Sequence, residues 1–463
     1  MTVKSKVTSN ARYATVGELT IAKVRRVGTR RRWRPVLKPV VVGAGAISLA
    51  LGVLATGAGT AGAARRTKEV TNFASYVGGH GKANPRLSPV YIGVVNQQTA
   101  PNAPTPTWTT GVEIAQKFIN QHAGGIDGHP VDLILCKIPT TVGSAAKCGQ
   151  EFADNPKVIA VAAGGIDVGN SALESALKPA KKPLFFCVSL STVDEKYTYG
   201  FILYGTTAQV EAPMASTAHN LHIKSVSVVY PLNIPGNVYQ ATVVEDALKY
   251  VGIKRVYKVG FTSSDTNFSE PFDAAHVGHT TLLILVNSGG PACSDTYLTL
   301  KSLGIATKTK VLVNVPCDTP TVAKADGGTL PHDWYYLTAV PMPGSHTPAL
   351  AAFLKVADSY GKGAVAVNAW TGNGFGEVTT IAKLATEILK AHKKLTPLAV
   401  FAAGRAFKGP VALGAPHLDC GGFKGAPATC NDLDRFYQNV APTVMKPLGS
   451  WISSPKGFTP PVT

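Results

Sequence analysis

The stretch that decides the fold is INQHAGGIDGHPV, residues 119–131. The residues before it repeat apolar side chains at helical spacing, and a short apolar run follows it. Gly124 and Gly125 can take the positive φ angles that end a helix, and Gly128 can make the turn into the next strand. The stretch therefore predicts a helix–turn–strand joint of the kind found in α/β folds.

Short apolar runs alternate with amphipathic segments on both sides of this joint, and the alternation restarts after Gly205. Continuous apolar strands that alternate with helices are typical of parallel sheets covered on both faces. We therefore predict an α/β fold with two lobes. The expected strands are 90–95, 131–135, 158–163, 184–188, 226–230, 256–259, 281–286, 311–315 and 335–339, and the expected helices are 110–120, 144–153, 171–177, 243–250, 268–275, 294–303, 349–360 and 376–391.

The amino-acid sequence of residues 119–131 resembles a joint of the bacterial type I periplasmic binding proteins. Within that class it is similar to the branched-chain amino-acid (Leu/Ile/Val) receptor-like family of ABC importer substrate-binding proteins. Further matches follow in the family's order: YIGVV at 91–95, PLFF at 183–186 and TNFS at 266–269. The resemblance covers about residues 88–445. It implies two Rossmann-like lobes with parallel sheets, joined by a multi-strand hinge, and a protein that is not an enzyme.

The resemblance and the composition together predict a domain order. Chain crossings near 203–207 and 339–343 would form the hinge between the lobes. The expected segments are 1–63 as a signal peptide, 64–87 as a linker, 88–205 as the first part of lobe 1, 206–341 as lobe 2, 342–410 as the second part of lobe 1, and 411–463 as a C-terminal crossover and tail.

The N-terminal segment carries most of the excess charge. The 463-residue chain has a formal net charge of +18, and residues 1–63 hold 11 basic residues and one acid, or +10 of it. Basic, apolar and small residues follow one another there, which predicts a secretory signal cleaved after Ala63. An uncleaved membrane anchor at 39–64 is the alternative. The remaining +8 gives no reason to expect nucleic acid as a partner, and membrane contact is expected only through the signal or anchor.

The seven cysteines also fit an exported protein, extracellular or in the cell envelope. None lies between residues 1 and 135, so the chain has no lipobox cysteine. Cys187 lies in an apolar run and is expected to be a buried free thiol. The nearest-neighbour arrangement predicts three disulfides: Cys136–Cys148, Cys293–Cys317 and Cys420–Cys430.

The resemblance also implies ligand-binding positions in lobe 1. In the family, hydroxyl groups and backbone N–H groups at helix starts hold the ligand's carboxylate. The matching positions here are the loop with Gly165, Ile166 and Asp167, and the pair Ser191 and Thr192. Helix capping is the alternative role for Ser191 and Thr192.

Lobe 2 of the family supplies an acid for the ligand's ammonium group, and Asp318 matches that position. The adjacent Cys317, bonded to Cys293 at the end of a neighbouring strand, would help to fix it. Trp108 and Tyr230 are aromatic candidates for the cleft wall, with packing in the core as their alternative role.

Three departures from the family pattern leave the ligand open. Asp167 stands where the family has hydroxyl groups, and it would repel a carboxylate. An aromatic residue expected after the first strand of lobe 2 is absent, and so is an acidic pair after the second strand of lobe 1. An amino acid, an amide, a cationic molecule or an aromatic acid all remain candidates.

The sequence contains no nucleophile-elbow motif and no Walker A loop, so neither a hydrolase nor a nucleotide-binding enzyme is supported. We expect no catalytic residue, no metal and no cofactor. The expected function is that of an exported receptor, which captures a small polar molecule between its lobes and delivers it to the permease subunits of an ABC importer. A membrane-anchored or secreted ectodomain that senses a ligand without transport is the alternative.

Overall fold

The computed structural model describes most of the chain beyond the predicted signal peptide, which lies outside the described residues. Within the part that it describes, no helix has both the length and the apolar character needed to cross a membrane. The described residues are 69–99, 105–139, 141–166, 168–189, 191–205, 207–262, 264–286, 290–314, 317, 320–332, 334–366, 368–441 and 444–461.

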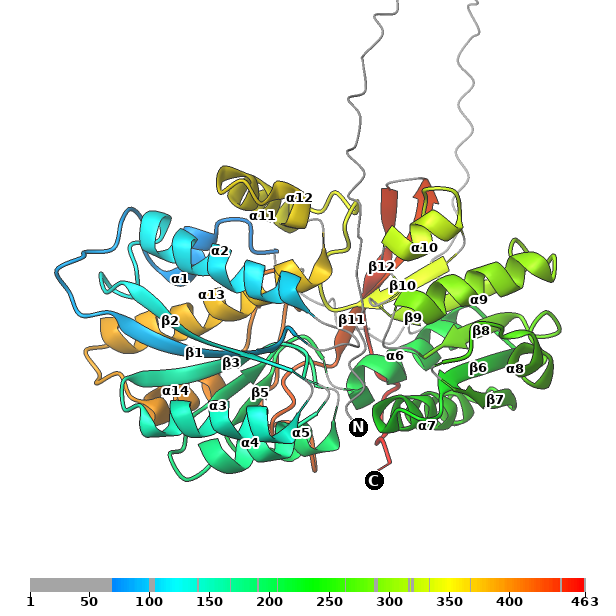
Figure 1. The fold of residues 1–463 in the computed structure, drawn as a ribbon, viewed down its shortest axis with the longest axis horizontal. Coiled ribbons are helices and arrows are strands. Elements are labelled where there is room, and N and C mark those ends of the chain that lie inside the picture. Colours follow the sequence, from blue (N-terminus) through cyan, green and yellow to red (C-terminus); the bar gives the residue numbers. More distant parts are fainter. Residues whose placement is uncertain are drawn as a thin grey trace, which may run out of the picture. The chain divides into compact units, whose positions relative to one another are not determined.

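The first sheet has five strands in the order β2-β1-β3-β4-β5, and every neighbouring pair is parallel. The chain begins with β1, adds β2 on one side and then adds the other strands on the opposite side. Figure 1 shows this sheet with helices on both of its faces. Its strands are β1 (Val90–Gln97), β2 (Val131–Ile138), β3 (Val158–Ala163), β4 (Leu184–Phe186) and β5 (Gly200–Ile202).

Alternate side chains of β1 supply two separate cores, as a strand with both faces covered requires. Val94 packs in the cluster that includes α1, α2 and α13, whereas Val95 packs in the cluster that includes α3 and α4. The helices of this half are α1 (Phe73–Val77), α2 (Pro106–His122), α3 (Val142–Asp154), α4 (Asn170–Leu177), α5 (Thr192–Lys196), α11 (Pro348–Ser359), α12 (Gly363–Ala366), α13 (Ala369–Lys390) and α14 (Pro397–Ala406).

The second sheet repeats the same winding. Its parallel part has the order β10-β9-β8-β6-β7, in which β6 comes first along the chain and β7 and β8 flank it. Two antiparallel strands, β11 and β12, extend the sheet beyond β10. The strands are β6 (Ser225–Pro231), β7 (Arg255–Phe261), β8 (Leu282–Leu285), β9 (Lys310–Asn314), β10 (Trp334–Thr338), β11 (Leu433–Ala441) and β12 (Val444–Ser453).

Two cores also cover the second sheet. Val228 packs in a cluster with α6 and α7, and its neighbour Val229 packs in a cluster with α8 and α9. These alternating cores, together with the two parallel sheets, confirm the predicted α/β class with two halves. The helices of this half are α6 (Thr207–Asn220), α7 (Pro235–Tyr250), α8 (Ser269–Ala274), α9 (Gly290–Ser302) and α10 (Pro320–Ala325).

The helix–turn–strand joint forms as the sequence predicts. Gly124 and Gly125 both have φ of +74°, and Gly128 has φ of +91°. Gly125 is the most constrained of the three, because a Cβ atom there would lie 2.2 Å from the carbonyl oxygen of His129. Only glycine combines this backbone conformation with so close a contact.

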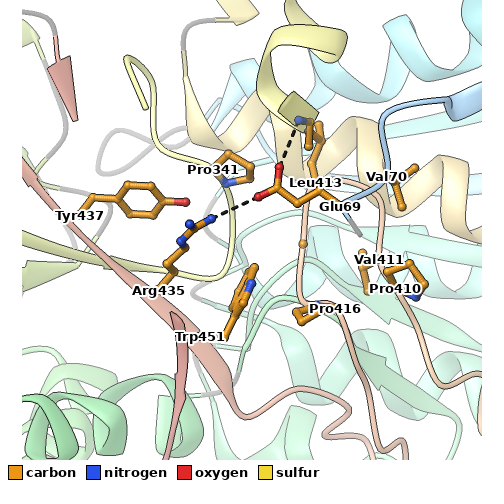
Figure 2. A pocket seen from close by; sticks show the side chains of 12 residues that line it. Glu69, Val70, Pro341, Pro410, Val411, Leu413, Pro416, Arg435, Tyr437 and Trp451 are labelled. Atoms are coloured by element: carbon orange, nitrogen blue, oxygen red, sulfur yellow. Dashed lines mark hydrogen bonds and ion pairs between the residues drawn. The ribbon is translucent and has the colours of Figure 1, made fainter. Parts of the chain in front are cut away.

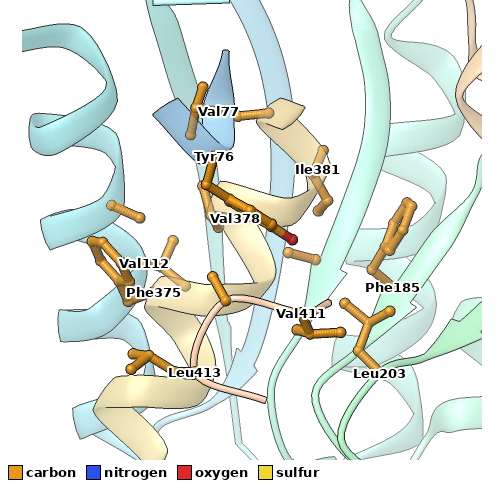
Figure 3. Packing of buried hydrophobic residues seen from close by; sticks show 14 of the residues in the cluster. Tyr76, Val77, Val112, Phe185, Leu203, Phe375, Val378, Ile381, Val411 and Leu413 are labelled. Atoms are coloured by element: carbon orange, nitrogen blue, oxygen red, sulfur yellow. The ribbon is translucent and has the colours of Figure 1, made fainter. Parts of the chain in front are cut away.

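The prediction that residues 64–87 form a linker is wrong for the described part of that segment. Residues 73–77 form the helix α1, and the side chains of Phe73, Tyr76 and Val77 are buried in the core of the first half. Figure 3 shows Tyr76 and Val77 beside Val378 and Ile381 of α13. One helical turn with three apolar side chains is too short to show a period in the sequence.

The C-terminal segment also differs from its description as a crossover and tail. It crosses to the second sheet and adds two full strands to it, rather than ending as an irregular tail. Their alternation is interrupted by register shifts, such as the one between Asp434 and Phe436, which obscure the strand pattern in the sequence.

All three predicted disulfides are present, and Cys187 is the buried free cysteine. Cys136–Cys148 joins β2 to α3, and Cys420–Cys430 closes a loop before β11. Cys293 lies in the first turn of α9, and not at the end of a strand as expected.

Because α1 is part of the core, Phe73→Ala should destabilise the protein. Its ring packs against Phe375 with centroids 4.9 Å apart and against Phe118 with centroids 6.3 Å apart. We expect the free energy of unfolding to fall by about 3–5 kcal/mol, as for other buried aromatic truncations, measured by urea denaturation. Leu87→Ala, at an exposed position of the same segment, is the control and should change it by less than about 0.5 kcal/mol. Equal effects of the two substitutions would restore the linker description.

Candidate functional site

The strand order places a candidate binding edge on each sheet. In open α/β sheets, ligands bind beyond the carboxyl ends of the strands, where the winding direction reverses. In the first sheet the reversal falls between β1 and β3, and in the second sheet it falls between β6 and β8. The loops that follow these four strands are therefore the first candidates for ligand contacts.

The loop after β1 is anchored by a buried amide. Asn96 Nδ2 donates to the carbonyl oxygen of Thr105 at 2.7 Å and to Thr109 Oγ1 at 2.8 Å. Its Oδ1 accepts a hydrogen bond of 2.8 Å from the hydroxyl of Thr105. The neighbouring loop after β3 packs on this amide, because a Cβ atom on Gly164 would lie 2.2 Å from Asn96 Oδ1. Asn96 at the end of β1 thus links the start of α2 to Gly164 directly after β3.

The three predicted residues of the loop after β3 have different positions. Gly165 is buried at the carboxyl edge of the sheet, where a Cβ atom would lie 3.3 Å from the ring of Trp370. Ile166 is buried in the core between α3, α4 and the sheet, so its side chain packs there. Asp167 lies outside the described residues.

Trp370 is an aromatic residue at this edge that the sequence prediction missed. It lies in the first turn of α13, is half-buried, and its ring is the nearest neighbour of Gly165. The side chain of Asn368 caps this helix by accepting from the backbone N–H of Trp370 at 2.9 Å. Trp370 is about 200 residues away from Gly165 in the sequence, so only the fold brings them together.

Ser191 has the capping role that was the alternative to ligand binding. Its Oγ accepts a hydrogen bond of 3.1 Å from the backbone N–H of Val193 at the start of α5. The side chains of Ser191 and Thr192 are half-buried, so both still reach the surface beyond β4.

Trp108 is fully buried in the first core, and its structure supports the packing alternative. It lies next to Glu377, a buried carboxyl group of α13 that accepts a hydrogen bond of 3.0 Å from the backbone N–H of Ala163. Burial raises the pKa of Glu377 well above its ordinary value, although this hydrogen bond and the Trp108 indole oppose the shift. Trp108 and Glu377 therefore lie buried beneath the candidate edge.

The edge of the second sheet is less completely described. Tyr230 lies near the carboxyl end of β6, is half-buried, and packs on the core with α6 and α7. Leu232, just beyond this strand, is 51% exposed. Asp318 lies outside the described residues, and its neighbour Cys317 is buried and bonded to Cys293.

A pocket beside β11 contains none of the predicted site residues. Figure 2 shows its ion pair, in which Arg435 Nη1 of β11 lies 3.2 Å from Glu69 Oε1. Glu69 Oε2 also accepts from the backbone N–H of Ala349 at 3.2 Å. Both oxygens of Glu69 are thus engaged within the protein. The lining residues are Glu69, Val70, Pro341, Ala349, Pro410, Val411, Leu413, Gly414, Pro416, Arg435, Tyr437 and Trp451.

Two doubly wound α/β halves, each with its loops gathered at the carboxyl edge of a parallel sheet, define a class of ligand-binding fold. Residues 89–422 match the model of the periplasmic binding protein family. The chain belongs to this family, and its fold is that of a type I periplasmic binding protein, as the sequence resemblance implied.

Solved structures with the same fold are distant in sequence. A leucine-binding protein from Thermotoga maritima has 18% identity and a TM-score of 0.62, covering 79% of this chain and 99% of its own. A solute-binding protein from R. palustris in complex with 4-hydroxybenzoate has 17% identity and a TM-score of 0.64, covering 80% and 99%. A fatty acid ABC transporter substrate-binding protein from Thermomonospora curvata has 16% identity and a TM-score of 0.64, covering 83% and 98%. No curated protein shows a significant match to the sequence.

The contact between the loops after β1 and β3 can be tested with glycine substitutions. Gly164→Ala places a methyl group against Asn96 and the ring of Trp108, so we expect the free energy of unfolding to fall by about 1–3 kcal/mol. Gly143→Ala is the matched control, because a Cβ atom there meets no atom within 4 Å. The control should leave stability unchanged or raise it slightly, since alanine favours a helix. Denaturant melts of both variants measure the difference, and equal stabilities would contradict the packing of these loops.

Proposed function

We propose that the protein is an exported solute receptor that binds a small molecule at the carboxyl edges of its two sheets and delivers it to an ABC importer. The observation that carries this proposal is that both sheets have the same doubly wound strand order. In such sheets the loops at the carboxyl edge form the ligand-binding site. Receptors of this kind act by binding and closure rather than by covalent chemistry, so we propose no enzymatic activity.

The edge of the first sheet offers an apolar rim. Val142, Val168 and Val193 lie in the segments that follow β2, β3 and β4, and they are 56%, 38% and 40% exposed. Their segments are neighbours: a Cβ atom on Gly169 would lie 3.2 Å from the Cα of Val142. Exposed valines in these three segments favour a ligand with an apolar body, and Trp370, next to Gly165, is an aromatic group of the same edge.

Polar groups near this rim suit a carboxylate or amide end. We propose that the hydroxyl of Thr192 and the backbone N–H groups at the start of α4 contact that end, with Ser191 supporting the loop. The N-cap of α4 is Gly169, which has no side chain to occupy those N–H groups. We place Gly165 at the base of the site, where it leaves room beside Trp370.

The named ligands of the similar structures share this chemistry. Leucine, fatty acids and 4-hydroxybenzoate each join a carboxylate to an apolar body. We propose the same class for this protein, and we propose Asp318 and Tyr230 of the second half as its partners for the other end of the ligand. Asp167 in the loop after β3 is the reason to test amides and cations as well.

Export and delivery are proposals of the same kind. Membership of a periplasmic binding protein family implies export, and the three disulfides suit an oxidising compartment. We propose that residues 1–63 direct this export and that the closed, ligand-bound form is recognised by membrane permease subunits.

A thermal-shift screen of residues 64–463 tests the proposed ligand class. The panel contains L-leucine, 4-hydroxybenzoate, octanoate, an amide such as L-glutamine, and spermidine as a cation. We expect a carboxylic acid with an apolar body to raise the melting temperature, because a ligand that binds only the folded state stabilises it by mass action. If only spermidine raised the melting temperature, the proposed class of carboxylic-acid ligands would be wrong. If no compound raised it, the result would count against a receptor.

Substitutions locate the site once a compound is found. Trp370→Ala should weaken its binding at least about tenfold, or ~1.4 kcal/mol, by isothermal titration below the melting temperature. Tyr250→Ala is the control, since Tyr250 is an exposed aromatic residue at the far end of α7. Asp318→Ala should weaken binding of compounds that carry an ammonium or amide group. Unchanged affinity in both Trp370→Ala and Asp318→Ala would remove the site from these edges.

A further inference from the structure

A pair of buried carboxyl groups lies directly behind the candidate edge of the first sheet. Glu174 is in α4 and Asp194 is in α5, and both side chains are buried. Neither group reaches the surface where we place the ligand. Burying a carboxylate is costly unless it is hydrogen-bonded or protonated, so such a pair calls for a physical explanation.

Asp194 connects two loops through hydrogen bonds. The side-chain amide of Asn170, the first residue of α4, lies 2.7 Å from Asp194 Oδ1 and 2.9 Å from Oδ2. The hydroxyl of Ser189 lies 3.1 Å from Asp194 Oδ2 and 2.7 Å from the carbonyl oxygen of Ser191. Asn170 ends the loop after β3, whereas Ser189 and Ser191 form the loop after β4. The carboxylate of Asp194 is therefore a clamp between two loops of the candidate site.

Glu174 lies beside this clamp. Burial raises the pKa of Glu174 to about 9, and the negative charge of Asp194 and a hydrogen bond between the two side chains act in the same direction. Two adjacent carboxyl groups titrate as a pair, and the first proton to leave does so from the better-solvated or better hydrogen-bonded group. A pKa of about 9 keeps the Glu174 carboxyl group protonated at neutral pH, next to the Asp194 clamp.

Other ionisable groups surround this pair. Glu195 is the next residue of α5, and Tyr197 caps that helix, where burial and the charge of Glu174 raise the pKa of its hydroxyl. Lys182, before β4, donates its ammonium protons to the carbonyl oxygens of Asn155 and Val158 at 2.9 and 2.6 Å. The ionisable groups of the helix packed on the other side of α4, α3, are exposed; they are Lys147, Glu151 and Asp154.

We propose that Glu174 is a positioning residue, whose proton holds Asp194 in place so that the loops after β3 and β4 keep their binding arrangement, and that loss of this proton releases both loops. Ligand affinity then falls at alkaline pH although neither Glu174 nor Asp194 contacts the ligand. This regulation rests on the proposed function for the location of the ligand, but the state of the loops can be measured in the ligand-free protein.

The proposal has a defined pH window. Between the ordinary pKa of 4.5 and about 9, the folded state keeps the Glu174 proton that the unfolded state has released. Stability of the wild type therefore falls as pH rises through this window, by up to about tenfold in the unfolding constant per pH unit. Glu174→Gln keeps a neutral donor to Asp194 but does not titrate, so its stability should gain on the wild type with rising pH.

Hydrogen exchange of the ligand-free protein, followed by mass spectrometry from pH 6 to pH 10, measures the loops themselves. After division by the intrinsic rates, exchange in peptides covering 164–170 and 189–196 should rise with pH up to about pH 9 in the wild type and level off above it. In Glu174→Gln it should stay constant over the whole range. Glu151→Gln, at the exposed position on α3, is the control and should follow the wild type.

Identical pH profiles of these peptides in the wild type and Glu174→Gln would overturn the proposal. If Glu174→Gln does not fold, the wild type alone decides the question: the two loops must open at alkaline pH while peptides covering 225–261 of the second sheet do not. Uniform opening of both regions would show general alkaline unfolding and would equally overturn it. Because no ligand is present, failure here leaves the proposed receptor function untouched.

Discussion

The rest of the structure depends on one constraint, which is that a parallel sheet must bury both of its faces. Within each sheet, a helix joins each parallel strand to the next and returns the chain to the same edge, so the loops after the parallel strands gather at the carboxyl edge. The strands become continuous apolar runs, because helices cover them on both sides. Polar groups that could contact a ligand are therefore found in the loops rather than in the strand centres. The loops at the reversal points, between β1 and β3 and between β6 and β8, are the main candidates.

Buried polar groups beneath the first edge turn these loops into a fixed surface. Asn96 ties the end of β1 to the start of α2, and Asp194 ties the start of α4 to Ser189 after β4. The carboxyl group of Glu377 is buried in the core at the end of β3, so it adds no negative charge to the surface of the candidate site. An apolar rim on a hydrogen-bonded base suits a receptor, which must keep its pocket ready for the ligand.

The sequence predicted those features that short-range chemistry determines. The glycines at 124, 125 and 128, the buried strands and the three disulfides were all accessible, because each depends on local spacing. Two tryptophans show the limit of sequence-based prediction. Trp108 was favoured as a site residue because it follows β1 closely, but its side chain is buried in the core. Trp370 lies beside Gly165 only because the fold brings a distant helix there. The short helix α1 and the irregular strands β11 and β12 carry too few periodic residues for a pattern to appear.

The central claim is that the ligand lies at the edge where β1 and β3 end, and a crystal structure of the protein with the most stabilising compound of the screen tests it most directly. The account predicts electron density for the compound beside Trp370, within hydrogen-bonding distance of the Thr192 hydroxyl or the first N–H groups of α4. Density in the pocket beside Glu69 and Arg435, with the edge of the first sheet unchanged, would contradict it.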